Sequence, residues 1–292
     1  MTILSSSALT NRIVEKAKSL GASIAGVASL ESLKNSPSHK IYPKIGINLK
    51  ENFIDTKDEL NIADLFWPAD AVSAVVIGIE HNADNLELDW WDGKGTPGNR
   101  LLIKVNSQLS KWIEKTFPIK TYKLPYSIEK GGLFLKDAAV YAGLGCIGKN
   151  NLVITPEYGP RVRFRALLLN KEAKSTESFE FNPCENCGQP CRKTCPTKAF
   201  QNTVYSANVL GQSILPGIDG TYDRVGCNIK MEKDIDDAAM MITGMDKKKN
   251  EIRQLIYDSE KSHIKTPTGD RSFNYCVRYC RKCELSCPVG IE

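Results

Sequence analysis

The residues of this chain that are best suited to chemistry are cysteines, which gather in two runs. Four of the ten cysteines form the run Cys184-x2-Cys187-x3-Cys191-x3-Cys195-Pro196. The second run is Cys280-x2-Cys283-x3-Cys287-Pro288, with Cys276 just ahead of it and Cys227 farther upstream. Apart from one extra residue before Cys191, this spacing is close to that of bacterial domains that bind two [4Fe–4S] clusters. Two adjacent clusters conduct single electrons, so the rest of the chain should indicate where the electrons go.

In such domains one run supplies three thiolates to a cluster, and a cysteine of the other run supplies the fourth. The first cluster is therefore predicted to bind Cys184, Cys187, Cys191 and Cys287. The second cluster is predicted to bind Cys195, Cys280, Cys283 and one more cysteine. That fourth ligand is Cys227 or Cys276, and we favour Cys227. We interpret Cys276 as a small buried apolar residue, and for Cys146 this interpretation competes with a contact to a cofactor.

Disulfides and zinc are the alternative interpretations of these cysteines. The N-terminal sequence MTILSSSALTNR lacks the basic start and long apolar stretch of a secretory signal, which predicts a cytoplasmic protein with reduced thiols. Zinc sites also use C-x2-C pairs, but a second such pair or two histidines usually complete them. The first run instead adds a third and a fourth cysteine and then a proline, which favours iron–sulfur over zinc.

Length and composition predict a globular protein with one large and one small domain. The chain has 292 residues, of which 41% are hydrophobic and 25% are charged, and its formal net charge is +5. No apolar run approaches the ~20 residues needed to cross a bilayer, so no membrane partner is expected. The mild positive charge tolerates an acidic partner or a nucleic acid without requiring either. His39, His81 and His263 show no metal-ligand spacing and are expected on the surface or in loops.

The hydrophobic pattern predicts helices and strands that interleave up to residue 170. Helices are expected at 8–20, 58–66, 100–117 and 133–142, with a charged helical region at about 232–258. Strands are expected at 23–27, 71–79 and 163–170, and the second of them reads as a buried central strand. Segments 36–56 and 86–99 are expected to be loops. This order indicates a mixed fold of the α/β or α+β class, with domains at 1–175 and 176–292 and a boundary near 171–178.

A glycine-rich segment, AGLGCIGKNN, follows the predicted helix at 133–142. Gly143, Gly145 and Gly148 lack a Cβ, so the backbone there can closely approach other backbone or a ligand. Free N–H groups in such a loop can hold anionic or amide oxygens. The glycine order matches a dinucleotide-binding loop, but such a loop follows a strand rather than a helix. It is not a Walker loop either, since Asn150 stands where that motif has Ser or Thr.

Read together with the cysteine runs, this segment is more specific. The stretch KDAAVYAGLGCIGKNNLVITPEYGPRVRFRALLL resembles the cobalamin-dependent epoxyqueuosine reductases, which are relatives of the reductive dehalogenases. The resemblance is strong from about residue 128 to residue 288 and weak before that. It implies a nitroreductase-like domain that holds base-off cobalamin, followed by a ferredoxin-like module with two [4Fe–4S] clusters. The clusters would then pass electrons to the corrinoid, which would reduce an organic substrate.

The resemblance also implies which residues contact the cofactor and the substrate. An ungapped count back from Ala142 puts Glu129 where the family has a catalytic aspartate, with Tyr126 as a neighbouring proton donor. The alternative for Glu129 is a surface charge beside Lys130. The expected cofactor contacts are Gly143, Gly145, Cys146, Gly148, Lys149, Asn150, Arg161 and Arg163. For the two arginines, the alternative is charge pairing on the surface of a strand.

Two further departures from the family pattern bear on the substrate. The tyrosine-bearing GRDYH-like segment of the tRNA-modifying members is missing, and TPGNRLL with the pair Trp90-Trp91 stands in its place. The chain also ends four residues after Pro288, which predicts a short member without the C-terminal helical-repeat domain that helps to grip tRNA. We therefore expect a small organic substrate and a low-potential electron donor such as ferredoxin or flavodoxin.

Three other functions stay open from the sequence alone. The chain could be a tRNA epoxyqueuosine reductase, with tRNA as its partner. It could be a non-catalytic electron-transfer or corrinoid-reactivating protein, which would carry clusters but hold the corrinoid only transiently. It could also hold flavin in place of the corrinoid, because the fold that it resembles also binds flavin.

Overall fold

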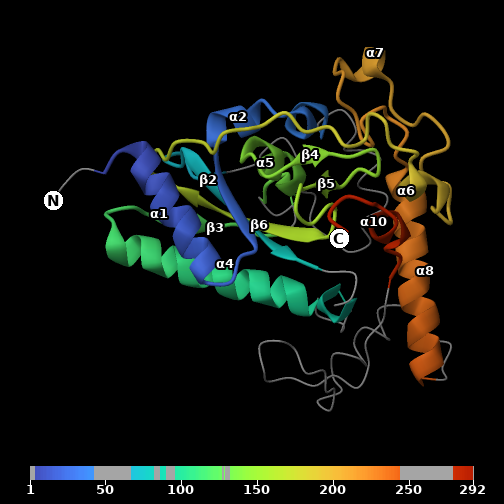
Figure 1. Cartoon of the computed structure of the whole chain (residues 1–292), viewed down its shortest axis with the longest axis horizontal. Helices are drawn as coiled ribbons and strands as arrows, with labels where there is room; N and C mark the ends of the chain where they lie inside the picture. The colour runs from blue at the N-terminus through green and yellow to red at the C-terminus, as the bar shows by residue number, and fades with distance from the viewer. Residues whose placement is uncertain are drawn as a thin grey trace.

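A computed structural model describes residues 4–42, 67–81, 86–89, 96–126, 128, 132–243 and 279–291 of the chain. The elements in its first part are α1 (Ser6–Ser19), β1 (Ile24–Ser29), α2 (Leu30–Lys34), β2 (Ser73–Glu80), the 3-10 helix η1 (Leu86–Asp89), α4 (Pro97–Thr116), β3 (Thr121–Lys123), α5 (Leu135–Tyr141), β4 (Cys146–Ile147), β5 (Val153–Ile154) and β6 (Val162–Leu169). The later elements are α6 (Pro190–Lys193), α7 (Ala207–Leu210), α8 (Arg224–Thr243) and α10 (Lys282–Leu285). Figure 1 shows their arrangement.

A four-stranded sheet in the order β1-β2-β6-β3 forms the centre of the fold, and all of its strand pairs are antiparallel. The central strands β2 and β6 pair from Ser73↔Leu169 to Glu80↔Val162. β2 is buried at every position except its last, Glu80. A strand that is apolar towards both sides requires a covering layer on each face of the sheet.

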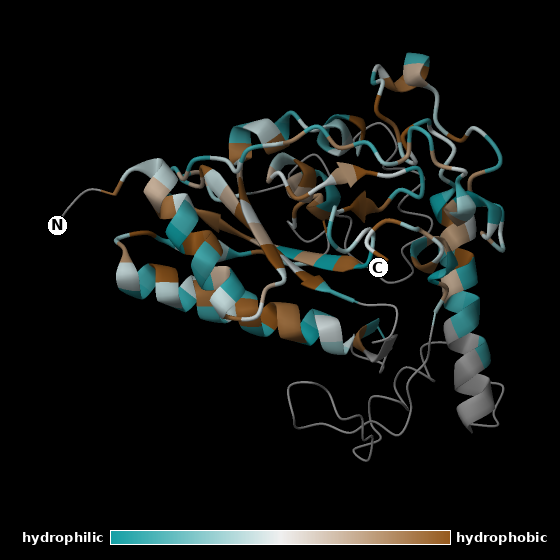
Figure 2. Cartoon of the chain, in the orientation of Figure 1, coloured by the Kyte–Doolittle hydropathy of each residue, from teal (hydrophilic) through white to brown (hydrophobic). Residues whose placement is uncertain are grey.

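Helices supply these two layers, with α1 and α4 on one face and α2 and α5 on the other (Figure 1). Alternate residues of β2 serve the two layers, since Val75 and Ile77 join the core with α1 and α4, whereas Ala74 and Val76 join the core with α5. Figure 2 shows the hydrophobic colour concentrated on the strands between the helices. The sheet is therefore a rigid platform to which the site is attached.

The helix α4 illustrates how the sequence builds this platform. It buries residues at three- and four-residue spacing, namely Leu102, Val105, Leu109 and Ile113. At its start, the Thr96 hydroxyl accepts a hydrogen bond of 3.2 Å from the Asn99 N–H, and Pro97 occupies the first turn. The helix is thus specified both by its apolar face and by its N-terminal cap.

After β6 the chain leaves the sheet and runs through loops that carry the short helices α6 and α7, and then through the long helix α8 (Figure 1). The helices α6 and α10, which carry cysteines of the two runs, lie next to each other. Arg161, one residue before β6, donates a hydrogen bond of 3.1 Å to the Cys287 carbonyl, so the second run is attached to the end of the sheet. No helix within the described ranges is long and apolar enough to span a membrane.

Most of the predicted elements are confirmed. The predictions at 8–20, 23–27, 71–79, 100–117, 133–142 and 163–170 correspond to α1, β1, β2, α4, α5 and β6. The mixed α/β character is also confirmed, although the sheet is antiparallel throughout. The division at residues 1–175 and 176–292 stays a prediction. The predicted helix at 58–66 lies outside the described residues.

Three expectations about local structure need correction, although the charged helix itself is confirmed for residues 232–243. Residues 37–42, expected to be part of a loop, are helical, because the Asp137 carboxylate accepts hydrogen bonds from the Ser38 N–H and hydroxyl at 2.9 and 2.7 Å. This cap comes from a distant part of the chain, so no local pattern predicts it. The charged helix begins at Arg224 rather than near 232, since Asp223 accepts a hydrogen bond of 3.0 Å from the Gly226 N–H. Within the expected loop at 86–99, residues 86–89 form η1 and α4 begins at Pro97.

Candidate functional site

Four thiols from the two runs form a first group. Burial raises the pKa of Cys191, and the negative charges of Cys287, Cys184 and Cys187 raise it further, so these four side chains lie near one another. Cys184 and Cys287 are buried and pack against Ile154 of β5. We call this group the first quartet. It combines three cysteines of the first run with the last cysteine of the second.

Four other thiols form a second quartet. Burial raises the pKa of Cys283 to about 12, and the charges of Cys227, Cys280 and Cys195 act in the same direction. Cys227 lies in the first turn of α8, whereas Cys276 lies outside the described residues. None of the cysteines in the described part of the chain forms a disulfide. In that part, no three Cys, His, Asp or Glu side chains are close enough together to hold a single metal ion.

Hydrogen-bond donors approach the sulfur atoms of both quartets. The Lys149 N–H lies 3.5 Å from Cys184 Sγ, and the Ala199 N–H lies 3.3 Å from Cys195 Sγ. The Tyr222 hydroxyl makes a side-chain hydrogen bond with Cys227. Donors placed in this way stabilise thiolates and influence any metal that the thiolates bind.

The glycine segment packs directly against other backbone. A Cβ on Gly145 would lie 2.1 Å from the Ile154 carbonyl oxygen, and a Cβ on Gly143 would lie 2.4 Å from the Glu177 carbonyl oxygen. A Cβ on Gly148 would meet the Ile154 side chain at 2.4 Å. Gly145 and Gly148 therefore allow the close approach of β4 to β5, whereas Gly143 allows the approach of the segment at Glu177. Ile154 of β5 in turn packs against the first quartet. Cys146 lies half-buried in the same cluster, and burial raises its pKa to about 11.

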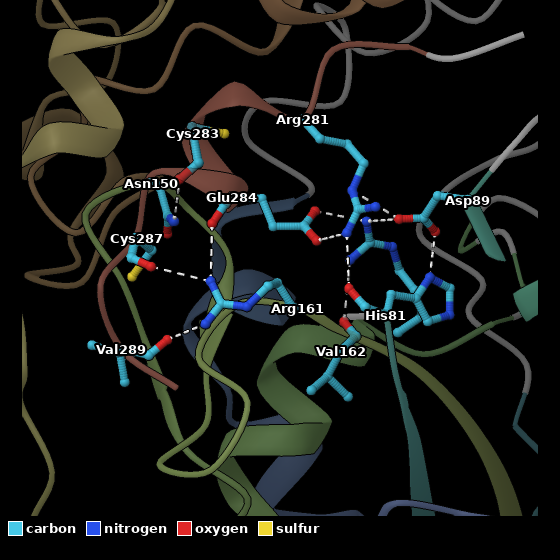
Figure 3. Close-up of polar contacts among 11 residues, drawn as sticks. His81, Asp89, Asn150, Arg161, Val162, Arg281, Cys283, Glu284, Cys287 and Val289 are labelled. Atoms are coloured by element: carbon cyan, nitrogen blue, oxygen red, sulfur yellow. Dashed lines mark hydrogen bonds and ion pairs between the residues drawn. The ribbon is translucent and has the colours of Figure 1, made fainter. Parts of the chain in front are cut away.

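Asn150 and Arg161 attach the second cysteine run to the segments that precede β5 and β6, as Figure 3 shows. Both side chains are buried. The Asn150 amide donates to the Cys283 carbonyl at 3.4 Å. The Arg161 guanidinium donates to the carbonyls of Cys287 at 3.1 Å and Glu284 at 3.4 Å, and also to that of Val289. These two residues hold the backbone of the second run from several directions.

A buried charge network lies beside these contacts (Figure 3). Arg163 Nη2 is 2.8 Å from Asp89 Oδ2 and 2.7 Å from Glu284 Oε2. Arg281 Nε is 2.9 Å from Asp89 Oδ2, and Arg281 also pairs with Glu284. The charge pairing considered for Arg163 is therefore present, but its carboxylate partners are buried rather than on the surface of a strand.

His81 belongs to the same network and contacts the Asp89 carboxylate. Its side chain is completely buried, although the residue lies in the loop after β2 as one of the two expected placements had it; only the alternative of a surface position was wrong. Burial lowers the pKa of His81, although Asp89 opposes this shift. Burial alone would raise the pKa of Asp89, but the charge of Arg163 and the hydrogen bond from His81 outweigh it and lower that pKa to about 2. A neutral histidine and an ionised aspartate result at neutral pH.

A cavity of about 300 Å³ borders the second quartet, and all four of its cysteines line the wall. Its apolar lining comes from α5, β5 and β6 and includes Leu135, Val153, Val162 and Phe164. Its polar lining includes Tyr126, Lys136, Asn150, Arg163, Tyr222 and Glu284. The cavity therefore connects the cysteine module with the edge of the sheet.

The structure brings together some of the predicted site residues and separates others. Tyr126, Asn150 and Arg163 line the cavity, and the Tyr126 side chain is 58% exposed. The three glycines and Cys146 are not among the lining residues. The backbone N–H of Lys149 donates to Cys184 of the first quartet, and the Lys149 carbonyl accepts a hydrogen bond of 2.9 Å from Arg192. Glu129 lies outside the described residues.

Sequence reasoning missed several cavity residues. Arg281 and Glu284 lie between cysteines of the second run. The spacing of that run predicts a role for its cysteines but none for the residues between them. Lys136 lies at the second position of α5 and reaches the cavity, where burial and the charge of Arg224 lower its pKa to about 8. The available signal was the charged pair Lys136-Asp137 within the otherwise apolar stretch LFLKDAAV.

Comparisons with known proteins give a consistent picture. No family model matches the chain. An epoxyqueuosine reductase of Gloeobacter violaceus is 32% identical over 106 residues, which are 36% of this chain and 32% of the relative. A tetrachloroethene reductive dehalogenase of Sulfurospirillum multivorans is 37% identical over 65 residues, which are 21% of this chain and 13% of the relative. The matches thus span about a third or less of these relatives' length.

The fold is shared with solved structures of the same kinds of protein. The epoxyqueuosine reductase of Streptococcus thermophilus aligns with a TM-score of 0.55 and 22% identity over 96% of this chain and 65% of that chain. An epoxyqueuosine reductase with an epoxyqueuosine-modified tRNA-Tyr stem loop aligns with a TM-score of 0.56 and 18% identity over 97% of this chain and 65% of that chain. A reductive dehalogenase described as B12-dependent aligns with a TM-score of 0.55 and 15% identity over 89% of this chain and 35% of that chain.

Proposed function

We propose that this chain, which is related in sequence and fold to epoxyqueuosine reductases and reductive dehalogenases, is a cobalamin-dependent iron–sulfur reductase. The observation that carries the proposal is the gathering of eight cysteines into two quartets, one of which lines a cavity at the edge of the sheet. In this proposal the first part of the chain is a nitroreductase-like domain, and residues from 176 onward form a ferredoxin-like module.

The donor set of each quartet fits a [4Fe–4S] cluster. In domains with two clusters, each cluster binds four cysteine thiolates that come from both runs. Backbone N–H groups also donate hydrogen bonds to a sulfur atom in each quartet. The sulfurs of a single tetrahedral zinc site would lie within roughly 4 Å of one another. The third and fourth cysteines of the first run, its Cys-Pro ending and the mixing of the two runs in each quartet favour iron–sulfur clusters over such zinc sites.

The cavity fits one edge of a base-off corrinoid. Its wall combines apolar side chains suited to a flat macrocycle with Asn150 and Arg163, which can bind amides or a phosphate. A whole corrinoid is larger than a cavity of about 300 Å³, so these walls account only for the part of the cofactor beside the second quartet. When bound, cobalamin supplies a metal centre that can be reduced to a strongly reducing state.

The chain's own residues then have distinct tasks. The second quartet, which lines the cavity, would hold the cluster nearer the cofactor, and the first quartet would hold the cluster on the side of the electron donor. Tyr126 lies on the cavity wall with an exposed side chain, where its hydroxyl can donate a proton to a reduced substrate. Glu129 stays a second candidate for this proton transfer. A ferredoxin or flavodoxin is the proposed electron donor, and a small organic molecule is the proposed substrate.

A tRNA substrate is the second candidate. One observation favours it, namely that the epoxyqueuosine reductase seen with a modified tRNA stem loop shares its fold with 97% of this chain. Reduction of an epoxyqueuosine-containing stem loop by the cobalamin-loaded protein would establish this function. Lack of turnover, with both clusters reduced by dithionite, would exclude it.

Anaerobic purification followed by iron analysis and spectroscopy tests the main proposal. We expect about eight irons per chain, because two four-iron clusters are proposed. Titration with cobalamin should give stoichiometric binding at micromolar concentration and the absorption and EPR spectra of a base-off corrinoid. Full iron content without cobalamin binding would refute the reductase and leave an electron-transfer protein. Binding of flavin in place of cobalamin would identify a different cofactor, and zinc in place of iron would overturn the proposal entirely.

A further inference from the structure

Lys136 lies beside the second quartet, and within the described residues no carboxylate forms an ion pair with it. Its side chain lines the cavity together with all four cysteines of that quartet. Within the described residues, the other cations of the lining are paired, since Arg163 and Arg281 contact Asp89 and Glu284, and Lys230 contacts Asp234. No carboxylate of the described residues makes such a contact with Lys136. Its closest acidic neighbour in sequence, Asp137, is instead bound by Ser38.

The protein holds the Lys136 side chain in a defined position. Lys136 Nζ donates a hydrogen bond of 2.5 Å to the Asn151 carbonyl. Asn151 adopts a left-handed conformation with a φ of 58°, which asparagine tolerates better than most residues, and its side chain accepts a hydrogen bond of 3.0 Å from the Gly217 N–H. The Lys136 ammonium also lies 5.9 Å from the centroid of the Tyr222 ring. The ammonium is therefore directed along the cavity wall and not into solvent.

Tyr222 provides a second interaction with the same quartet. Its hydroxyl makes a side-chain hydrogen bond with Cys227. Its ring packs against Phe200 with centroids 5.5 Å apart, and burial raises the pKa of the hydroxyl well above its ordinary value. A phenol O–H in this position is a hydrogen-bond donor to sulfur. An ammonium and a phenol thus approach one set of thiols.

We propose that Lys136 and Tyr222 raise the reduction potential of the cluster held by the second quartet, Lys136 as its counter-charge and Tyr222 as a hydrogen-bond donor to the Cys227 ligand. The inference rests on the proposed function, since it requires that this quartet hold an iron–sulfur cluster. Reduction adds one electron from a one-electron donor to the cluster, and no bond forms or breaks. The added negative charge is stabilised by the ammonium and by the hydrogen bond, which favours the reduced state.

The proposal predicts a raised reduction potential for only one of the two clusters. Lys136 and Tyr222 both line the cavity beside the second quartet. The first quartet packs instead against Ile154, Phe181 and Val289, and none of its four cysteines lines the cavity. A cluster with a raised potential next to the cavity would collect electrons from the other cluster and hold them for the cofactor.

An EPR-monitored redox titration of the cluster-loaded protein at pH 7 tests the inference. At this pH, below the lowered pKa of about 8, Lys136 carries its proton. Lys136→Met removes the charge at similar length, and Tyr222→Phe removes the hydroxyl while keeping the ring against Phe200. We expect both variants to shift one of the two midpoint potentials to a more negative value and to leave the other unchanged. Lys136→Arg, which keeps the charge, should retain the wild-type potentials.

A surface lysine supplies the control. Lys104 is exposed on α4 and does not line the cavity, so Lys104→Met should leave both midpoints unchanged. Variants with about eight irons and two unshifted midpoints would overturn the inference, while the proposed function would stand. If Lys136→Met fails to fold, the other two variants still test the inference. Unchanged midpoint potentials in Tyr222→Phe would overturn the role of the hydroxyl. A changed midpoint potential in Lys136→Arg would overturn the role of the charge. A wild-type protein without reducible clusters would refute the proposed function itself.

Discussion

Arg163 and Glu284 lie 121 positions apart in the sequence, yet Nη2 of the arginine is 2.7 Å from Oε2 of the glutamate. Arg163 belongs to the central strand β6, and Glu284 belongs to the helix α10 between two cysteines of the second run. Their contact therefore joins the rigid sheet to the cysteine module. Since the same glutamate also pairs with Arg281, its single carboxylate neutralises two guanidinium groups.

Loss of this carboxylate should weaken the folded state considerably. In a Glu284→Leu variant, Asp89 is the one carboxylate of the described residues that still pairs with Arg163 and Arg281. Removing one partner from a buried charge group typically lowers the free energy of unfolding by about 3–5 kcal/mol, because an uncompensated charge stays buried. Urea denaturation followed by circular dichroism, on samples of equal iron content, measures the change.

The matched control is an exposed ion pair. Lys174 and Glu177 lie 3.4 Å apart, and both side chains are more than half exposed. Glu177→Gln should lower the free energy of unfolding by less than about 1 kcal/mol, since exposed pairs contribute little. Equal effects of the two substitutions would show that the buried network does not join the two parts of the chain.

The glycine segment should tolerate no side chain at Gly145. A Cβ there would lie 2.1 Å from the Ile154 carbonyl oxygen, so β4 and β5 would have to separate. Because Ile154 packs against Cys184 and Cys287, Gly145→Ala should reduce the iron bound by the first quartet. Iron analysis and EPR after anaerobic reconstitution measure this loss, which should approach half of the wild-type iron.

Gly188 offers a control for the same measurement. It lies in the first run itself, between Cys187 and Cys191, and a Cβ there would have no neighbour within 4 Å. Gly188→Ala should therefore keep the full iron content. If both variants retained their iron, the packing of β4 on β5 would not support the first quartet.

Local patterns predicted the elements and the cysteine groups, but not the charge network. Apolar periodicity located α4 and β2 because each element buries its own face against the sheet. By contrast, the Arg281 side chain donates to the His81 carbonyl across 200 positions, a relationship that no local pattern contains. For this reason the sequence predicted a surface or loop position for His81 but not its complete burial. The sequence around Lys136 likewise does not predict that its side chain points to the cavity, because its hydrogen-bond partner Asn151 lies 15 positions away.

The buried His81 should make stability depend on pH. Its pKa is lowered in the folded state by burial, whereas in the unfolded chain it has the ordinary value of 6.5. Below about 6.5 the unfolded state binds a proton that folded His81 resists, so stability falls as the pH decreases from 6.5 towards the folded pKa. The slope contributed by one group is at most about 1.4 kcal/mol per pH unit. Urea denaturation between pH 5.5 and 7.5 should show it.

His81→Gln removes this proton-binding group and should reduce the slope below pH 6.5. Part of the slope should persist, because burial also lowers the pKa of His39. His39→Gln therefore serves as the companion variant, and the two substitutions together should give a nearly flat profile. A His81→Gln variant with the wild-type slope would show that His81 does not titrate differently on folding.

Serine substitutions should identify the fourth ligand of the second cluster. Cys227 lies near Cys195 and Cys280, its pKa is raised by burial, and Tyr222 donates a hydrogen bond to it. Cys227→Ser should therefore lower the iron content of the anaerobically reconstituted protein towards about four per chain and remove one of the two cluster signals from the EPR spectrum. Cys276→Ser, at the alternative position, should keep about eight irons and both signals. The reverse result would assign the ligand to Cys276, and a loss in both variants would mean that each cysteine is needed for the cluster to form.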